Sequence, residues 1–172
     1  SSDLNMLYLE NHDHPRIISR YGSEQYWKES GKTLAAAMLF QQGTPFIYQG
    51  EEIGMTNAGF ATIDQYRDVE SLNYYTESTA RGMDPSAALE ILRHASRDNA
   101  RTPMQWTPGP GAGFTDGVPW IGIGPRYKEI NVERDQASEK SVFRYSRQLI
   151  RMRHELPVVA TGDFEPIHAN HP

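Results

Sequence analysis

A short apolar run near the start of the chain gives way abruptly to polar residues. Residues 7–9 (Leu-Tyr-Leu) are typical of a buried strand, whereas residues 10–13 (Glu-Asn-His-Asp) bring together two carboxylates, an amide and an imidazole. Pro15 has no amide hydrogen for a sheet ladder, so the strand must end before it. Polar side chains at such a position are typical of the edge of a barrel that carries its chemistry. They are equally typical of a polar turn.

The same pattern returns after a helical segment. Apolar residues at positions 34, 35, 38 and 39 share one face of a helix that we expect Ser30 to cap and Gly43 to end. A second apolar run, residues 46–48, then ends in the polar residues 49–52. This order predicts a βαβ unit with both polar clusters at the carboxyl ends of parallel strands. Because one such unit cannot cover both faces of its own sheet, we expect a fragment of a longer protein or one chain of a cleaved one.

Further elements are expected in the middle of the chain. Residues 63–75 could be helical, and Asp84 followed by Pro85 predicts a capped helix that runs to about Ala95. The segment that follows includes residues 107–126, which hold six glycines and four prolines and therefore favour irregular structure.

This long loop is expected to be ordered. Phe114 and Trp120 are its expected packing anchors, and Trp106 is interpreted in the same way. A loop of this length inside a compact domain is more often functional than accidental.

The last strong helical pattern covers residues 138–156, and we expect Ser138 to cap it. Residues 158–167 are then typical of strands around a turn. We therefore assign residues 1–157 to one domain and residues 158–172 to the incomplete start of a second, β-rich domain.

Composition excludes several classes of protein. The 172 residues carry 17 basic and 22 acidic side chains, and a net charge of −5 argues against a nucleic-acid-binding surface. No apolar run approaches the roughly 20 residues of a membrane span, so we expect no membrane partner. Cysteine is absent, which excludes disulfides and thiolate metal sites and fits a reducing compartment. We therefore expect a cytoplasmic protein.

The polar cluster after the first strand has two chemical interpretations. His12, Asp13 and His14 invite a metal site, but successive residues of an extended segment point to opposite faces, so we expect no metal. A sugar site is favoured by the mixture of Asp, His, Arg, Asn, Gln, Tyr and Trp at loop positions. Carbohydrate hydroxyls need both donors and acceptors, and sugar faces need aromatic walls.

Four motifs in order carry a resemblance to a known family: ENHDHPRIISRYG, QQGTPFIYQGEEIGMTN, IDQYRDVESLN and SRDNARTPMQW. They closely resemble the α-glucosidases of the α-amylase superfamily (glycoside hydrolase family 13). The most similar branch contains oligo-1,6-glucosidases, sucrose isomerases and trehalose synthases. The resemblance implies an α/β fold, the C-terminal part of a (β/α)8 TIM barrel leading into an antiparallel β domain.

Within that fold, the resemblance implies a position for each element. Residues 7–10 resemble the seventh barrel strand, and residues 46–49 resemble the eighth. Residues 138–156 resemble the final barrel helix. Strands one to six, which carry the family's aspartate nucleophile and glutamate acid/base, have no counterpart in this sequence.

The resemblance also implies roles for four residues. Asp13 is similar to the third carboxylate of the family, which binds the hydroxyls at carbons two and three of glucose and stabilises the transition state. His12 is expected to donate a hydrogen bond to a nearby sugar hydroxyl. Arg97 resembles an arginine that reaches the same subsite, and Glu70 resembles an acidic residue at the pocket entrance.

Other charged residues are interpreted as structural. Arg101 is expected to form a scaffold ion pair, and Arg16 and Arg20 are expected to brace the loop after the first strand. Glu51 and Glu52 are expected to support the site without taking part in the chemistry.

The implied function is a retaining α-glucosidase, a glycoside hydrolase acting on isomalto- or malto-oligosaccharides or sucrose without a cofactor. One alternative is a sucrose isomerase or another transglucosidase that forms trehalulose or trehalose. A second is a non-catalytic, glucosidase-like scaffold or an inactive fragment. Because the nucleophile and the acid/base lie outside this sequence, we expect a missing N-terminal segment or a partner chain to supply them.

Overall fold

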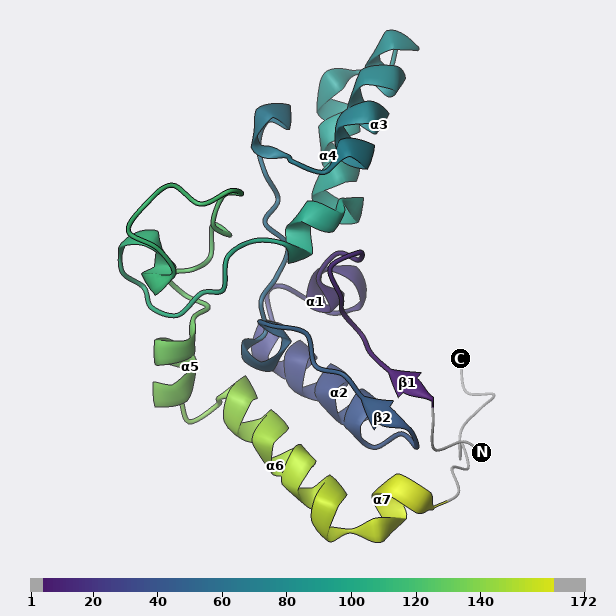
Figure 1. Cartoon of the computed structure of the whole chain (residues 1–172), viewed down its shortest axis with the longest axis vertical. Helices are drawn as coiled ribbons and strands as arrows, with labels where there is room; N and C mark the ends of the chain where they lie inside the picture. The colour runs from purple at the N-terminus through teal and green to yellow at the C-terminus, as the bar shows by residue number, and fades with distance from the viewer. Residues whose placement is uncertain (1–4, 163–172) are drawn as a thin grey trace.

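The computed structural model describes residues 5–162, and its centre is a pair of parallel strands joined by a helix (Figure 1). Strand β1 (Met6–Leu7) pairs with β2 (Thr44–Pro45), and helix α2 (Trp27–Leu39) makes the connection between them. The predicted βαβ unit is confirmed.

Both strands are shorter and begin earlier than the apolar runs predicted. The ladder is set by the amide of Thr44, which donates to the carbonyl of Asn5 at 2.8 Å, and by that of Phe46, which donates to the carbonyl of Leu7 at 2.7 Å. Tyr8 and Phe46 are each 48% exposed. Within the described residues neither strand has a second neighbour. The later residues of both apolar runs lie beyond the paired segment.

Helix α2 begins at Trp27 and therefore lacks the predicted Ser30 cap. The Ser30 hydroxyl instead accepts a hydrogen bond from the amide of Ser23 at 2.9 Å. Gly43 makes the turn into β2 with a φ of +136°, where a Cβ would lie 2.7 Å from the carbonyl oxygen of Asn5. A glycine is required there because an L side chain would be strained and would collide with backbone.

Helix α6 (Val142–Glu155) lies beside α2 and shares its apolar core (Figure 1). Ala35, Met38 and Leu39 of α2 form a buried cluster with Leu149 of α6. Burying apolar area in this way is the main term that holds the two helices together.

The prediction that Ser138 caps this helix is wrong. Ser138 ends a short preceding helix, α5 (Val132–Ala137), and the cap of α6 is Ser141, whose hydroxyl accepts from the amide of Arg144 at 2.9 Å. The buried carboxylate of Asp135 supports the same end, because it accepts from the hydroxyl of Ser141 at 2.6 Å.

The strands predicted after Pro157 are also partly wrong. Residues Pro157–Thr161 form a short helix, α7, with proline in its first turn, where the missing amide hydrogen costs nothing. The rest of that prediction, residues 163–172, lies outside the described residues.

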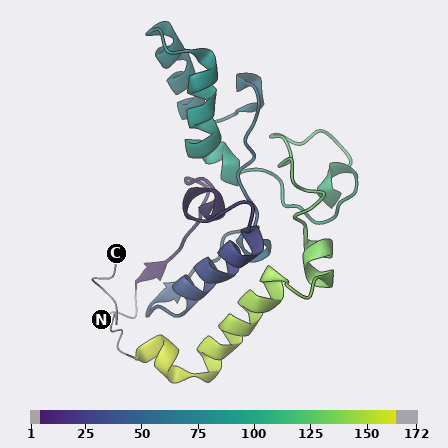
Figure 2. The same ribbon diagram turned by 180° about the vertical axis from the view of Figure 1, so that it is seen from behind.

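A helical hairpin projects from the body (Figures 1 and 2). It consists of α3 (Val69–Ala80) and α4 (Pro85–Ala95). Asp84 caps α4 as predicted, accepting from the amides of Ser86 and Ala87. The helix expected over residues 63–75 is split into a short 3-10 turn and α3.

Two smaller features complete the description. Helix α1 (Ile17–Tyr21) occupies the loop after β1, and residues 107–126 are irregular apart from a 3-10 turn, Pro110–Gly113. The prediction that Phe114 and Trp120 anchor that loop by packing is wrong, since Phe114 is 51% exposed and Trp120 is 65% exposed. Trp106 is also exposed. No helix among residues 5–162 is long and apolar enough to cross a membrane.

Candidate active site

A buried ion pair ties the ends of the two strands together. The side chains of Glu10 and Arg16 are almost fully buried, and Nη1 of Arg16 lies 2.8 Å from Oε2 of Glu10. The same nitrogen donates to the carbonyl of Gln49 at 2.7 Å, and the guanidinium lies 5.3 Å from the centre of the Tyr48 ring. The amide of Ile17 donates to Oε1 of Glu10 at 2.8 Å. Arg16 therefore braces the loop after β1, as predicted.

Two further carboxylates follow β2 in a 3-10 turn, Glu51–Ile53. Burial, reinforced by the charge of Glu10, raises the pKa of Glu51 to about 8. Burial also raises the pKa of Glu52. Glu51 and Glu52 accept hydrogen bonds from the amides of Tyr48 and Gly50, so they shape the turn. Neither of them lines the pocket beside Asp13.

Glu51→Gln is expected to weaken the dependence of stability on pH. In the parent protein the folded state binds the Glu51 proton more tightly than the unfolded state, whose pKa is near 4.5. The free energy of unfolding should therefore fall as pH rises from about 4.5 to about 8, and it should level off above that. Urea unfolding across this pH range measures the slope. Glu133→Gln, at an exposed position of α5, is the matched control, and an equally steep slope in Glu51→Gln would contradict the assignment.

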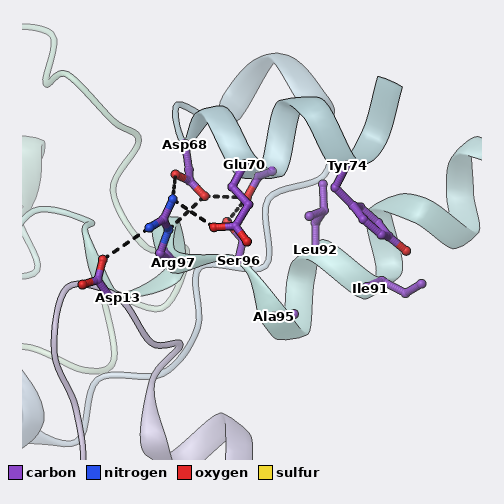
Figure 3. A pocket seen from close by; sticks show the side chains of 10 residues that line it. Asp13, Asp68, Glu70, Tyr74, Ile91, Leu92, Ala95, Ser96 and Arg97 are labelled. Carbon is purple, nitrogen blue, oxygen red and sulfur yellow. Dashed lines mark hydrogen bonds and ion pairs between the residues drawn. The ribbon is translucent and has the colours of Figure 1, made fainter. Parts of the chain in front are cut away.

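Asp13 lies in a polar turn, half-exposed at the edge of a pocket (Figure 3). Its amide donates to the side-chain oxygen of Asn11 at 2.8 Å. Its Oδ1 lies 3.5 Å from Nη1 of Arg97 and 3.2 Å from Nη2 of Arg101. Its Oδ2 lies 3.2 Å from Nε2 of His12. One carboxylate oxygen is thus occupied by guanidinium groups, while the other faces an imidazole.

Arg101 forms ion pairs as predicted, and Asp13 itself is one of its partners. It also donates from Nε to the carbonyl of His12 at 2.8 Å, so it fixes both the backbone and the side chain of this turn. Charge-assisted hydrogen bonds of this kind are stronger than neutral ones and orient the acceptor.

Asp68, which sequence reasoning missed, contacts both arginines. Its Oδ1 lies 2.7 Å from Nη2 of Arg97 and 3.5 Å from Nη1 of Arg101, and the side chain is 6% exposed. Burial pushes the pKa of Asp68 up, but the hydrogen bond and charge of Arg97 outweigh it and hold the pKa below its usual value. The only local signal was an acidic residue just before a helix, which is typical of an ordinary cap.

The pocket beside Asp13 has a volume of about 310 Å³ and lies against the α3–α4 hairpin. Glu70, in the first turn of α3, is largely exposed and lies 3.1 Å from Nη2 of Arg97. Asp13, Glu70 and Arg97 all line this pocket. His12 is not among its lining residues, but its Nε2 contacts the Asp13 carboxylate. The structure thus brings three of the four predicted site residues to one pocket and places the fourth beside Asp13. Tyr74, Ile91 and Leu92 add an apolar wall (Figure 3).

Histidine and carboxylate side chains do not gather into a metal site. Among residues 5–162, no group of three or more His, Asp or Glu side chains is arranged to hold an ion. The His14 ring stacks on Tyr8 with centroids 6.5 Å apart. The pocket lining combines charged and hydrogen-bonding groups with an apolar wall, which suits a polar ligand with several hydroxyls.

Residues 1–162 match the family model described as "Alpha amylase, catalytic domain". The chain is 48% identical to an oligo-1,6-glucosidase of Parageobacillus thermoglucosidasius, over 98% of this chain and 30% of that protein. It is 49% identical to a trehalose-6-phosphate hydrolase of Escherichia coli (strain K12), over 98% of this chain and 31% of that protein. It thus spans about a third of the length of these relatives.

Solved structures agree with the sequence comparison. The trehalose-6-phosphate hydrolase of Bacillus licheniformis superposes with a TM-score of 0.90 at 48% identity, over 93% of this chain and 29% of that one. The trehalulose synthase MutB, solved with its substrate sucrose, superposes with a TM-score of 0.89 at 42% identity, over 95% of this chain and 30% of that one.

Proposed function

This chain belongs to the alpha-amylase family, whose fold is a TIM barrel, and we propose that it is the part of a retaining α-glucosidase that carries the third carboxylate. In this proposal β1 and β2 are the seventh and eighth barrel strands, and α6 is the final barrel helix. The parallel pairing of β1 with β2 through α2 supports it, because each barrel strand is joined to the next by a helix. The β domain beyond residue 158 stays a prediction, as does the cytoplasmic location.

The arrangement of Asp13 is the observation that carries the proposal. Two guanidinium groups lie on Oδ1 and orient the carboxylate, and Oδ2, which faces Nε2 of His12 at 3.2 Å, is the oxygen that accepts hydrogen bonds from the hydroxyls at carbons two and three of glucose. As the glycosidic bond breaks, positive charge develops on the sugar ring. A carboxylate held in place beside the ring stabilises that charge more in the transition state than in the ground state.

The neighbouring residues complete the glucose-binding site. His12 donates to a hydroxyl next to the one that Asp13 binds, and Arg97 contacts the sugar from the wall of the pocket. Glu70, exposed at the pocket mouth, meets the leaving group or the second sugar. The nucleophile and the acid/base come from the barrel strands that this chain does not contain, which is consistent with relatives about three times its length.

Isomerisation is a second candidate function. The similarity to trehalulose synthase MutB, whose substrate is sucrose, is nearly as strong as the similarity to the hydrolases. The two outcomes differ in whether water or the released fructose attacks the covalent glucosyl intermediate. A non-catalytic scaffold is the weakest alternative, because the ion pairs around Asp13 are of the kind that an active site needs.

Turnover of p-nitrophenyl α-glucoside by two preparations tests the proposal. The purified 172-residue chain alone should release no p-nitrophenol, because it lacks two of the three carboxylates. The complete protein, with the preceding barrel strands, should turn the substrate over and release α-glucose first, as retention requires. Sucrose as substrate separates hydrolysis from isomerisation by its products. Turnover by the isolated chain, or none by the complete protein, would refute the proposal.

A further inference from the structure

We propose that Asp68 is a positioning residue that clamps Arg97 and Arg101 against the Asp13 carboxylate. This inference rests on the proposed function for its kinetic consequence, although its geometry can be tested separately. It adds to the predicted site a fifth residue, one that acts through the two arginines.

The first observation is that Asp68 occupies the N-cap position of α3 without capping it. Its side chain accepts no hydrogen bond from the backbone of that helix. Asp84, at the same position of the neighbouring helix α4, accepts from the amides of Ser86 and Ala87. Asp84 therefore stabilises the backbone of its own helix, whereas the Asp68 side chain contacts other side chains, two arginines and the Ser71 hydroxyl.

The second observation is a closed arrangement of two carboxylates and two guanidinium groups. Arg97 contacts Asp68 through Nη2 and Nε, at 2.7 and 3.3 Å, and contacts Asp13 through Nη1. Arg101 contacts Asp68 through Nη1, at 3.5 Å, and Asp13 through Nη2. Each arginine thus uses different nitrogens for the two acids, so Asp68 fixes the rotation of both guanidinium planes.

The third observation is that Asp68 is itself held rigidly. Its amide donates to the buried carboxylate of Asp98 at 2.8 Å, and its Oδ2 accepts from the hydroxyl of Ser71 at 3.2 Å. The Ser71 hydroxyl is in turn 2.7 Å from that of Ser96. An acceptor with a supported position is what a precise site requires from its surroundings.

Both arginines have other partners to turn to when Asp68 is neutralised. Arg97 lies 3.1 Å from the exposed carboxylate of Glu70. Arg101 lies 3.9 Å from Oδ1 of Asp98, a buried oxygen that accepts no hydrogen bond. Without the Asp68 charge, these carboxylates compete with Asp13, and the Asp13 side chain loses its fixed orientation.

Asp68→Asn in the complete enzyme tests the inference kinetically. Asparagine keeps the size of aspartate, but it removes the charge and turns one of the two acceptor oxygens into a donor. We expect kcat for p-nitrophenyl α-glucoside to fall about 100-fold, the effect of misplacing a reacting group by about 1 Å. KM should change far less, because the lost contact matters most in the transition state. Asp68→Glu, which restores a carboxylate, should recover at least tenfold of the loss.

Asp84→Asn is the matched control, since it makes the same substitution at the other N-cap of the hairpin, and its kcat should equal that of the parent. A kcat of Asp68→Asn near the parent value, or a loss that Asp68→Glu does not relieve, would overturn the kinetic claim. If Asp68→Asn does not fold, Asp68→Glu decides through its crystal structure. There the introduced carboxylate should still contact both arginines, and arginines held on Asp13 without that contact would overturn the inference.

A crystal structure of Asp68→Asn tests the positioning directly. Arg97 and Arg101 should no longer both contact Oδ1 of Asp13, and at least one should lie on Glu70 or Asp98. If both still contact Asp13, the inference is wrong whatever the kinetics show. If the parent enzyme has no glucosidase activity, the proposed function fails, and this structure still decides the role of Asp68.

Discussion

Asp13→Asn should lower kcat of the complete enzyme for α-glucosides by about 10³-fold, at the upper end of what loss of one preorganised electrostatic group costs. The substitution keeps the shape and one acceptor oxygen of the side chain, so the sugar can still bind. It removes the negative charge that faces the ring as the oxocarbenium-like transition state forms. The effect should therefore appear in kcat more than in KM.

The fold should tolerate this change. The Asp13 side chain is 48% exposed, and its amide, which binds Asn11, is unaffected by the substitution. Thermal unfolding followed by circular dichroism, with Asp116→Asn in the exposed loop as control, separates loss of activity from loss of structure. Near-normal turnover by Asp13→Asn would refute the role given to this residue.

Arg16→Met should have the largest effect on stability. The substitution leaves the Glu10 carboxylate buried without its partner, and breaking a buried ion pair from one side costs about 3–5 kcal/mol. The carbonyl of Gln49 loses a donor at the same time. The free energy of unfolding, measured in urea at neutral pH, should fall by that amount relative to the parent.

Two further variants show that the loss comes from the unpaired charge. Arg20→Met replaces an exposed arginine four residues along and should change stability by no more than about 0.5 kcal/mol. Glu10→Gln combined with Arg16→Met should recover part of the loss, because the glutamine is neutral and its carbonyl can still accept from the amide of Ile17. A double variant no more stable than Arg16→Met would contradict this explanation.

Elements specified by neighbouring residues were predictable from the sequence. The Asp84 cap of α4 involves amides only two and three residues away, so the local pattern contains the whole interaction. The βαβ order followed from the alternation of apolar runs and one helical period. The ends of β1 and β2 were not predictable, because the ladder depends on which residue pairs with Asn5, some 40 positions away.

The site residues likewise fall into those that the sequence predicted and those that only the folded chain reveals. Motif resemblance predicted His12, Asp13, Arg97 and Glu70 as site residues, and the structure places the last three around one pocket with His12 beside Asp13. Asp68 was missed because an acidic residue before a helix looks like a cap, and only the folded chain shows that its side chain serves residues 29 and 33 positions later. The prediction that Phe114 and Trp120 anchor the long loop failed because it assumed that large aromatic residues are buried.

The chain leaves the pocket at Asp68, runs out along α3 and back along α4, and returns to the pocket at Arg97. The tip of this hairpin at residues 81–84 lies a full helix length away, and a Cβ added at Gly82 there would meet no other atom within 4 Å. Extra residues inserted at the tip would extend into solvent and leave the packing of the two helices unchanged. A single extra residue at either base would rotate the side chains that follow by about 100°. The hairpin can therefore tolerate extra residues at its tip while its base keeps a constant register, and the same tip offers a place to attach a probe without touching the pocket.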